Sequence, residues 1–249
     1  MTEALHRLLF YLLRVIITSM KKPKKIAAVF DLDGTLIDSM EIWREIDEEF
    51  FAKRGLSVPD RYQEKIAHLG FKECARFTAE NYLPDESEEN MIEEWKALSH
   101  SKYAAKDGGK YFKKGAAEFV RFLYGQGVRL AVATASSAEL FMPVLRAGEI
   151  AECFSCFVTV DEAGKNKSFS DIFHLAAKKI GVAEENCIVF EDNLSAIRAA
   201  KAAGMRTVGV YDAASRLLRE DIERTADFYI DSFTEIPESL KTILLAENE

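Results

Sequence analysis

Two aspartates stand directly after a short apolar segment near the start of the chain. Residues 27–30 read Ala-Ala-Val-Phe, and Asp31 and Asp33 follow with one leucine between them. If the apolar segment is a strand, side chains two positions apart project from the same face, so both carboxylates point to one side. Gly34 then lets the chain turn away, because it lacks a Cβ. Two gathered carboxylates repel each other unless a cation offsets their charge, which predicts a divalent metal; the alternative is a structural turn rich in aspartate.

A hydroxyl, a cation and two further carboxylates stand at the ends of later apolar segments or before predicted helices. Ligands of parallel α/β sheets bind beyond the carboxyl ends of the strands, so we expect these groups to meet the first two aspartates there. One polar residue at such a position would be weak evidence for a site, whereas the four together in this order are a specific signal. The residues are Thr134, Lys167, Glu191 and Asp192.

The segments that must position these residues alternate between strand-like and helical patterns. This alternation predicts an α/β fold, with a Rossmann-like parallel sheet covered by helices on both faces. Glycines that follow predicted helices, such as Gly148 and Gly181, mark plausible helix ends. We expect strands at 26–30, 128–134, 154–160, 187–190, 207–210 and 227–230, and helices at 116–124, 140–147, 170–180 and 195–203.

Residues 40–112 break this alternation, since they contain helical patterns and no convincing strand. Ile42, Trp43, Ile46 and Phe50, for example, recur at helical spacing. We therefore predict an all-helical cap domain at 40–112, inserted into a core formed by 25–39 and 113–249. The cap helices are expected from about 40 to Gly55 and at 61–68, 72–81 and 86–101, with hinges at Asp38-Ser39 and Gly108-Gly109.

The composition limits the partners of the chain. Its 249 residues are 48% hydrophobic, which is enough to bury a sizeable core, and the net charge is -8. Nucleic acid is not expected as a partner, because phosphate-backbone binding needs concentrated Lys and Arg. A small anionic substrate needs only a few local cations. Cys153 and Cys156 form an isolated pair that poorly supports zinc, and four reduced thiols fit a cytoplasmic protein, which we expect to be a monomer.

The first 24 residues are expected to be an N-terminal extension with no catalytic residue. The apolar run at 4–17 is shorter than the roughly 20 residues that a stable membrane span requires. It also lacks the leading positive charge of a secretory signal. Three interpretations stay open: an extra packed helix, a helix on a membrane surface, or a misplaced start with translation beginning at Met20.

In this order, the motifs resemble those of the haloacid dehalogenase-like superfamily. The resemblance covers residues from about 25 to 235, and the helical insertion stands where the helical-cap subfamily carries its cap. Phosphatases and proteins similar to beta-phosphoglucomutase share this arrangement. The matching motifs are Asp31-Leu-Asp33-Gly-Thr35, then Thr134, then Lys167, and finally Glu191-Asp192.

The resemblance implies a reaction in which Asp31 attacks phosphorus to give an aspartyl-phosphate. Asp33 would act as the general acid and then as the general base. Mg²⁺ would be held by Asp31, the backbone carbonyl of Asp33, Glu191 and Asp192, because it favours oxygen donors. The alternative for Glu191 is a position behind the ligands, where it orients Asp192.

The resemblance also implies which residues hold the transferring phosphoryl group. These are Thr35, Thr134, Ala135 and Lys167, which would contribute hydroxyl or backbone donors and one positive charge. Thr134 has a structural alternative as the cap of the following helix. Lys165 is the rival for the lysine, but Lys167-Ser-Phe-Ser-Asp171 aligns better with the family pattern, in which both of these serines are prolines.

Substrate choice is expected to depend on the cap, with Ser39, Trp43 and Lys72 as candidate contacts. Their alternatives include a cap-core aromatic for Trp43 and a solvated lysine for Lys72. Sugar phosphomutases carry a histidine where this chain has Trp43, and indole donates a hydrogen bond but cannot relay a proton. We therefore predict a Mg²⁺-dependent phosphatase of a small phosphorylated metabolite. A phosphomutase similar to beta-phosphoglucomutase and a catalytically silent binding module are the alternatives.

Overall fold

The computed structural model describes residues 26–105 and 111–246. Within these residues six strands form one sheet in the order β3-β2-β1-β4-β5-β6, and every neighbouring pair is parallel. The predicted α/β class and parallel sheet are thus confirmed. The strands are β1 (Ala27–Phe30), β2 (Arg129–Thr134), β3 (Cys156–Thr159), β4 (Cys187–Glu191), β5 (Arg206–Val210) and β6 (Phe228–Ile230).

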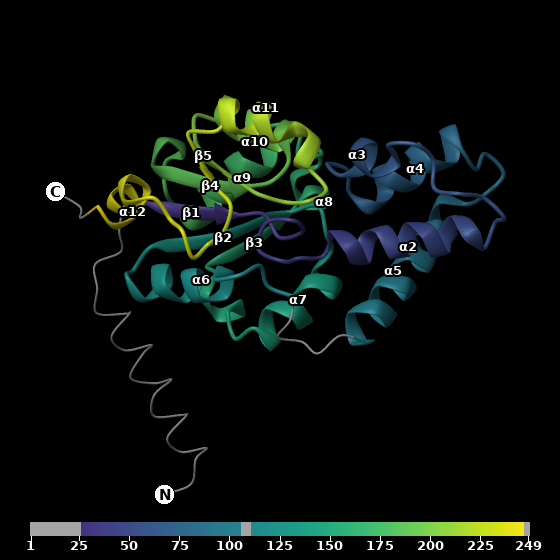
Figure 1. Cartoon of the computed structure of the whole chain (residues 1–249), viewed down its shortest axis with the longest axis horizontal. Helices are drawn as coiled ribbons and strands as arrows, with labels where there is room; N and C mark the ends of the chain where they lie inside the picture. Colours follow the sequence, from purple (N-terminus) through teal and green to yellow (C-terminus); the bar gives the residue numbers. More distant parts are fainter. Residues whose placement is uncertain (1–25, 106–110, 247–249) are drawn as a thin grey trace, which may run out of the picture.

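Helices cover both faces of the sheet (Figure 1). Because strand side chains alternate, β1 places Ala28 and Phe30 in one hydrophobic core and Ala27 and Val29 in the other. The first core is closed by α6 (Ala116–Gly125), α7 (Ala138–Ala147) and α12 (Glu238–Leu245), and the second by α9 (Asp171–Ile180) and α10 (Leu194–Ala202).

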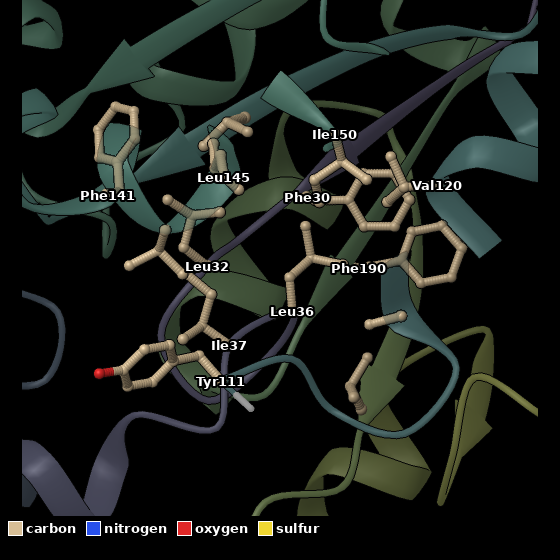
Figure 2. Close-up of a cluster of buried hydrophobic side chains, with 14 of the residues drawn as sticks. Phe30, Leu32, Leu36, Ile37, Tyr111, Val120, Phe141, Leu145, Ile150 and Phe190 are labelled. Atoms are coloured by element: carbon tan, nitrogen blue, oxygen red, sulfur yellow. The ribbon is translucent and has the colours of Figure 1, made fainter. Parts of the chain in front are cut away.

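Aromatic packing fixes the ends of the two central strands. Phe30 and Phe190 are register partners on β1 and β4, and their rings stack with centroids 4.6 Å apart (Figure 2). Both side chains are fully buried. Each is followed at once by an acidic residue, Asp31 or Glu191. This close-packed layer therefore sets where those two carboxylates leave the sheet.

Four helices between β1 and α6 form a separate cluster to one side of the sheet, and we call them the cap helices (Figure 1). Their shared core contains Phe50, Phe51, Tyr62 and Trp95, whose rings contact one another in a chain of aromatic pairs. The cap helices are α2 (Met40–Ala52), α3 (Tyr62–Ile66), α4 (Phe71–Asn81) and α5 (Glu88–Ala105).

The chain enters and leaves the cap helices through two antiparallel segments that touch. The backbone N–H of Asp38 donates to the carbonyl of Tyr111 over 2.6 Å, and that of Lys113 donates to Leu36 over 2.9 Å. One of the two expected hinges, at Asp38, lies in this pair of segments. The other, at Gly108-Gly109, lies outside the described residues, as does the N-terminal segment 1–24.

Several element boundaries differ from the sequence-based expectations. The strand expected at 154–160 is shorter, because Val160 begins the helix α8 (Val160–Ala163). The Thr159 hydroxyl accepts a hydrogen bond from the backbone N–H of Glu162, which caps that helix. The short helices α11 (Arg219–Thr225) and α12 were not expected. In the described part of the chain, no helix combines the length and the apolar character needed to cross a bilayer.

Candidate active site

A cavity of about 130 Å³ lies between the carboxyl ends of the strands and the cap helices. Its floor carries most of the chemically active residues that the sequence singles out. These are Asp31, Asp33, Thr134, Ala135, Lys167, Glu191 and Asp192, while Trp43 lines it from the cap.

Lys167 connects two carboxylates at the bottom of this cavity. Its Nζ donates to Oδ1 of Asp31 over 2.6 Å and also to Oε2 of Glu191. Burial raises the pKa of Asp31 to about 7, and the neighbouring Glu191 adds to this shift, while Lys167 opposes it. Burial by itself would lower the pKa of Lys167, but the two carboxylates hold it above its ordinary value. The ammonium group therefore stays charged beside Asp31.

The turn after β4 and the Lys167 ammonium each hold one oxygen of the Glu191 carboxylate. Oε1 accepts from the backbone N–H groups of Asp192 and Asn193, and Oε2 accepts from Lys167. The Asn193 side chain then caps α10 by accepting from the first backbone N–H groups of that helix. Glu191 is thus held rigidly between the strand end and Lys167.

Asp192 approaches the turn that follows Asp33 very closely. The Thr35 hydroxyl donates to Oδ1 of Asp192 over 2.8 Å. Gly34 has a φ of +86°, and a Cβ at this position would lie only 2.5 Å from Oδ2 of Asp192. Only glycine fits here, because both the backbone conformation and the space exclude a side chain.

Asp31, Glu191 and Asp192 form a buried acidic cluster in which ligand oxygens lie within 4.8 Å of one another. Burial raises the pKa of Asp192, and the nearby Glu191 and Asp31 raise it further. Within the described part of the chain, Oδ2 of Asp31 and Oδ2 of Asp192 accept no hydrogen bond. Hard oxygen donors whose negative charge Lys167 offsets only in part fit a divalent cation such as Mg²⁺.

The carboxylate of Asp33 has different surroundings, because uncharged donors hold it. Oδ1 accepts from the Ser39 hydroxyl at 2.6 Å, the Trp43 indole at 2.9 Å and the Tyr103 hydroxyl at 3.3 Å. Oδ2 accepts from the Ser136 hydroxyl at 2.6 Å. Two of these donors, Trp43 and Tyr103, belong to cap helices α2 and α5. The carboxylate of Asp33 is therefore a contact between the core and the cap, separate from the acidic cluster.

The end of β2 contributes hydroxyl and backbone groups. The Thr134 hydroxyl accepts a hydrogen bond of 3.0 Å from the backbone N–H of Ser136. This turn directs Ala135 and Ser136 toward the same cavity that Lys167 lines. The geometry suits an anion bound beside Asp31, with donors on one side and an ammonium on the other.

Some residues expected at the site have other partners. The Thr35 and Ser39 hydroxyls donate to Asp192 and Asp33, and neither residue lines the cavity. Lys72 is exposed on α4 and does not line it either. Lys165 is half-exposed and forms an ion pair with Asp171, whereas Lys167 is buried at the site.

Other residues at the site were not expected from the sequence. Ser136 stands two positions after Thr134, so its place at the strand end was a usable signal. Tyr103 offered none, because it lies 70 residues from its partner Asp33. The cap adds Asp47, Gln63, His68, Phe71 and Trp95 to the lining.

Backbone contacts hold the cap helices against the core at this cavity. The backbone N–H of Lys167 donates to the carbonyl of His68 over 3.2 Å. Gly70, at the start of α4, lies so close to the core that an added Cβ would come within 2.6 Å of the Val160 side chain. The cavity is therefore bounded by the cap helices on one side and by the core on the other.

Comparison with known proteins places this geometry among phosphate-processing enzymes. Residues 28–210 match the family model described as haloacid dehalogenase-like hydrolase. The chain is 31% identical over 221 residues to Protein CbbY of Cereibacter sphaeroides, covering 84% of this chain and 93% of that protein. It is 30% identical over 192 residues to the probable pseudouridine-5'-phosphatase of Drosophila melanogaster, covering 74% and 80%.

The fold is also similar to solved structures. A crystal structure of a CbbY mutant from Rhodobacter sphaeroides, in complex with xylulose-(1,5)bisphosphate, superposes with a TM-score of 0.74 at 27% identity. The similarity covers 84% of this chain and 95% of that one. The beta-phosphoglucomutase of Clostridium difficile superposes with a TM-score of 0.73, covering 88% and 96%, and at 21% identity this shows the shared fold alone.

Proposed function

This chain belongs to the haloacid dehalogenase-like hydrolase family, and we propose that it hydrolyses a small phosphorylated metabolite through an aspartyl-phosphate on Asp31, with the help of Mg²⁺. Its similarity to named phosphatases supports its assignment as a phosphoric monoester hydrolase. The observation that carries the proposal is the contrast between the two aspartates. Asp31 lies beside a buried ammonium and belongs to the acidic cluster, whereas Asp33 is held by uncharged donors.

In the first half-reaction, a carboxylate oxygen of Asp31 forms a bond to phosphorus. The bond between phosphorus and the ester oxygen breaks, and that oxygen takes a proton from Asp33. In the second half-reaction, Asp33 removes a proton from water as the water oxygen attacks phosphorus. The acyl-phosphate bond breaks, inorganic phosphate leaves, and both carboxyl groups return to their starting states.

The surrounding residues reduce the repulsion between the anionic phosphoryl group and the carboxylate of Asp31. Lys167 supplies a fixed positive charge 2.6 Å from Asp31. The donors at Thr134 and Ala135 are placed to bind the transferring oxygens, and Thr35 acts indirectly by holding Asp192.

We infer that Mg²⁺ would be held by the unpaired oxygens of Asp31 and Asp192, together with the backbone carbonyl of Asp33. Glu191 fits better as the residue that orients Lys167 and the turn that carries Asp192, because both of its oxygens already accept hydrogen bonds. When bound, the metal would offset the charge of the carboxylates and polarise a phosphoryl oxygen.

We assign residues 25–39 and 113–249 to the catalytic core and 40–112 to the cap. The cap would exclude water during phosphoryl transfer, because it covers the cavity and supplies two donors to Asp33. The phosphomutase alternative is less well supported, since Trp43 occupies the position of the mutase histidine. The silent-module alternative would fit a chain that lacked Asp31 or Asp33.

Hydrolysis of 4-nitrophenyl phosphate with Mg²⁺ tests the proposal. The wild type is expected to release nitrophenol, and Asp31→Asn is expected to abolish turnover. Asp33→Asn should slow both half-reactions while keeping the affinity for the metal. Acid quenching of the reaction, followed by mass spectrometry, should detect a phosphorylated Asp31. The matched control is Asp38→Asn, which removes an exposed carboxylate from the same segment. Full activity in Asp31→Asn would contradict the nucleophile assignment, and a screen of sugar, nucleotide and acid phosphates would identify the substrate.

A further inference from the structure

The cavity continues from the aspartates into the cap, where its wall has a different chemistry. Most of the lining there is apolar, but besides Trp43 four polar side chains interrupt it. Asp47 comes from α2, Gln63 from α3, His68 from the segment between α3 and α4, and Trp95 from α5. None of them has a part in the proposed phosphoryl transfer.

Asp47 lies one helical turn beyond Trp43, so both face the cavity from the same side of α2. Its side chain is buried, with 6% of the residue exposed. The Gln63 amide donates to Oδ2 of Asp47 over 3.1 Å, and in the described part of the chain this is the one hydrogen bond that the carboxylate accepts. A buried carboxyl group with a single partner is costly, so a further donor is expected to occupy this site during function.

Trp95 provides an independent sign that a polar ligand is missing. The residue is 4% exposed, and its indole Nε1 is buried without a hydrogen-bond partner among the described residues. Its ring packs against Phe50 and stacks on Phe71, with centroids 6.2 Å apart in the second pair. The ring is therefore fixed, and an unmet donor stands in the same wall as the acceptor Asp47.

The charge of the wall limits what this ligand can be. Among the described residues that line the cavity, Lys167 is the one lysine or arginine, and it already binds Asp31 and Glu191. Arg44 and Arg61 line an adjoining surface hollow, and they form ion pairs with glutamates of α2 and α3, respectively. His68 also lines the cavity, but burial lowers the pKa of its imidazole, so that ring is neutral at pH 8. Among the described residues, no cation is therefore placed to offset a second phosphate near Asp47.

We propose that Asp47, Gln63 and Trp95 form a subsite for the hydroxyl groups of an uncharged leaving group, so that the substrate is a sugar or polyol monophosphate and a bisphosphate is rejected. Hydroxyl groups both donate and accept, so one ligand can satisfy Asp47 and Trp95 together. The aromatic faces around them would contact the apolar faces of the same molecule. This assignment rests on the proposed phosphatase function, because it describes the part of the substrate beyond the phosphoryl group.

The test compares kcat/KM for glucose 6-phosphate, glucose 1,6-bisphosphate and 4-nitrophenyl phosphate at pH 8. If the substrate screen finds a better hydroxylated monophosphate than glucose 6-phosphate, that compound takes its place in the test. Asp47→Asn is expected to lower kcat/KM for the hydroxylated monophosphate by at least about tenfold, since one charge-assisted hydrogen bond is lost. The same variant is expected to raise kcat/KM for the bisphosphate, because a like charge is removed. Trp95→Phe should lower kcat/KM for the hydroxylated monophosphate and leave kcat/KM for 4-nitrophenyl phosphate unchanged.

Opposite signs for the two sugar phosphates separate recognition from a structural effect, which would move both in the same direction. The matched control is Glu49→Gln, which removes a carboxylate from the exposed face of the same helix. Equal responses of both sugar phosphates to Asp47→Asn, or a wild-type preference for the bisphosphate, would overturn the assignment. Hydrolysis of 4-nitrophenyl phosphate by the wild type, and its loss in Asp31→Asn, would still support the phosphatase function in that case.

Discussion

The indole N–H of Trp43 donates a hydrogen bond of 2.9 Å to Oδ1 of Asp33, which joins the first cap helix to the second aspartate of the motif. Asp33 is the proposed proton donor and acceptor, so the cap takes part in holding the group that handles protons. The orientation of this carboxyl group therefore depends on how the cap helices sit against the sheet.

Trp43→Phe should lower kcat by about tenfold, because a phenyl ring keeps the packing against Phe71 but cannot donate to Asp33. Tyr103→Phe is expected to cost less, since its hydroxyl lies farther from Asp33, at 3.3 Å. Steady-state kinetics with 4-nitrophenyl phosphate measure both variants. A wild-type kcat in Trp43→Phe would mean that this bond does not position Asp33.

Lys167→Met should lower kcat by at least about 100-fold, because the phosphoryl group and Asp31 would lose their shared positive charge. It should also destabilise the fold by about 3–5 kcal/mol at neutral pH, since two buried carboxylates would lose their partner. Steady-state kinetics checks the first effect, and urea unfolding in EDTA checks the second. Lys165→Met is the control, because that lysine is half-exposed and pairs with Asp171 at the surface. Equal effects of both substitutions would contradict this account.

The sequence located the residues that stand beside a local signal. Asp31 directly follows one apolar strand and Thr134 ends another, while Lys167 precedes a helix that begins near a serine. The parallel sheet follows from the alternation of strands and helices, which local hydrophobic periodicity reports well. The order of the strands and the exact partner of each side chain depend on tertiary packing, which a single sequence does not contain.

Tyr103 and Asp47 illustrate what the sequence could not provide. Both stand on helices, and at helical spacing a residue that contacts the site looks the same as one that packs in a core. Thr35 shows the opposite limit, since its motif indicated phosphate binding while its hydroxyl donates to Asp192. The contacts of Tyr103 and Thr35 join segments that are 70 and 157 positions apart along the chain, and that of Asp47 joins two different helices.

Mg²⁺ should bind to the wild type and raise its melting temperature, because a ligand of the folded state alone stabilises it. Asp192→Asn should weaken the affinity by at least about 100-fold, since a proposed metal ligand is lost. Isothermal titration calorimetry with Mg²⁺ alone measures this without reference to activity. The control is Asp171→Asn, which removes a surface carboxylate. An unchanged affinity in Asp192→Asn would place the metal elsewhere.

Asp47 is expected to make the protein less stable as pH rises through the weakly acidic range. Burial raises its pKa to about 7, and the hydrogen bond from Gln63 only partly opposes this. Between about pH 4 and pH 7 the folded state keeps a proton that the unfolded state has released, so the free energy of unfolding falls as pH rises. Above pH 7 both states are ionised and the loss stays constant.

Asp47→Asn removes this titration, so its free energy of unfolding should exceed that of the wild type by about 1–4 kcal/mol at pH 8 and differ little at pH 4. Urea unfolding at several pH values measures the difference, and Glu49→Gln is the exposed control. A parallel pH dependence in wild type and Asp47→Asn would show that Asp47 ionises normally in the folded protein. A stabilised variant that also loses its preference for hydroxylated monophosphates would show that the buried carboxyl group is kept for recognition at the expense of stability.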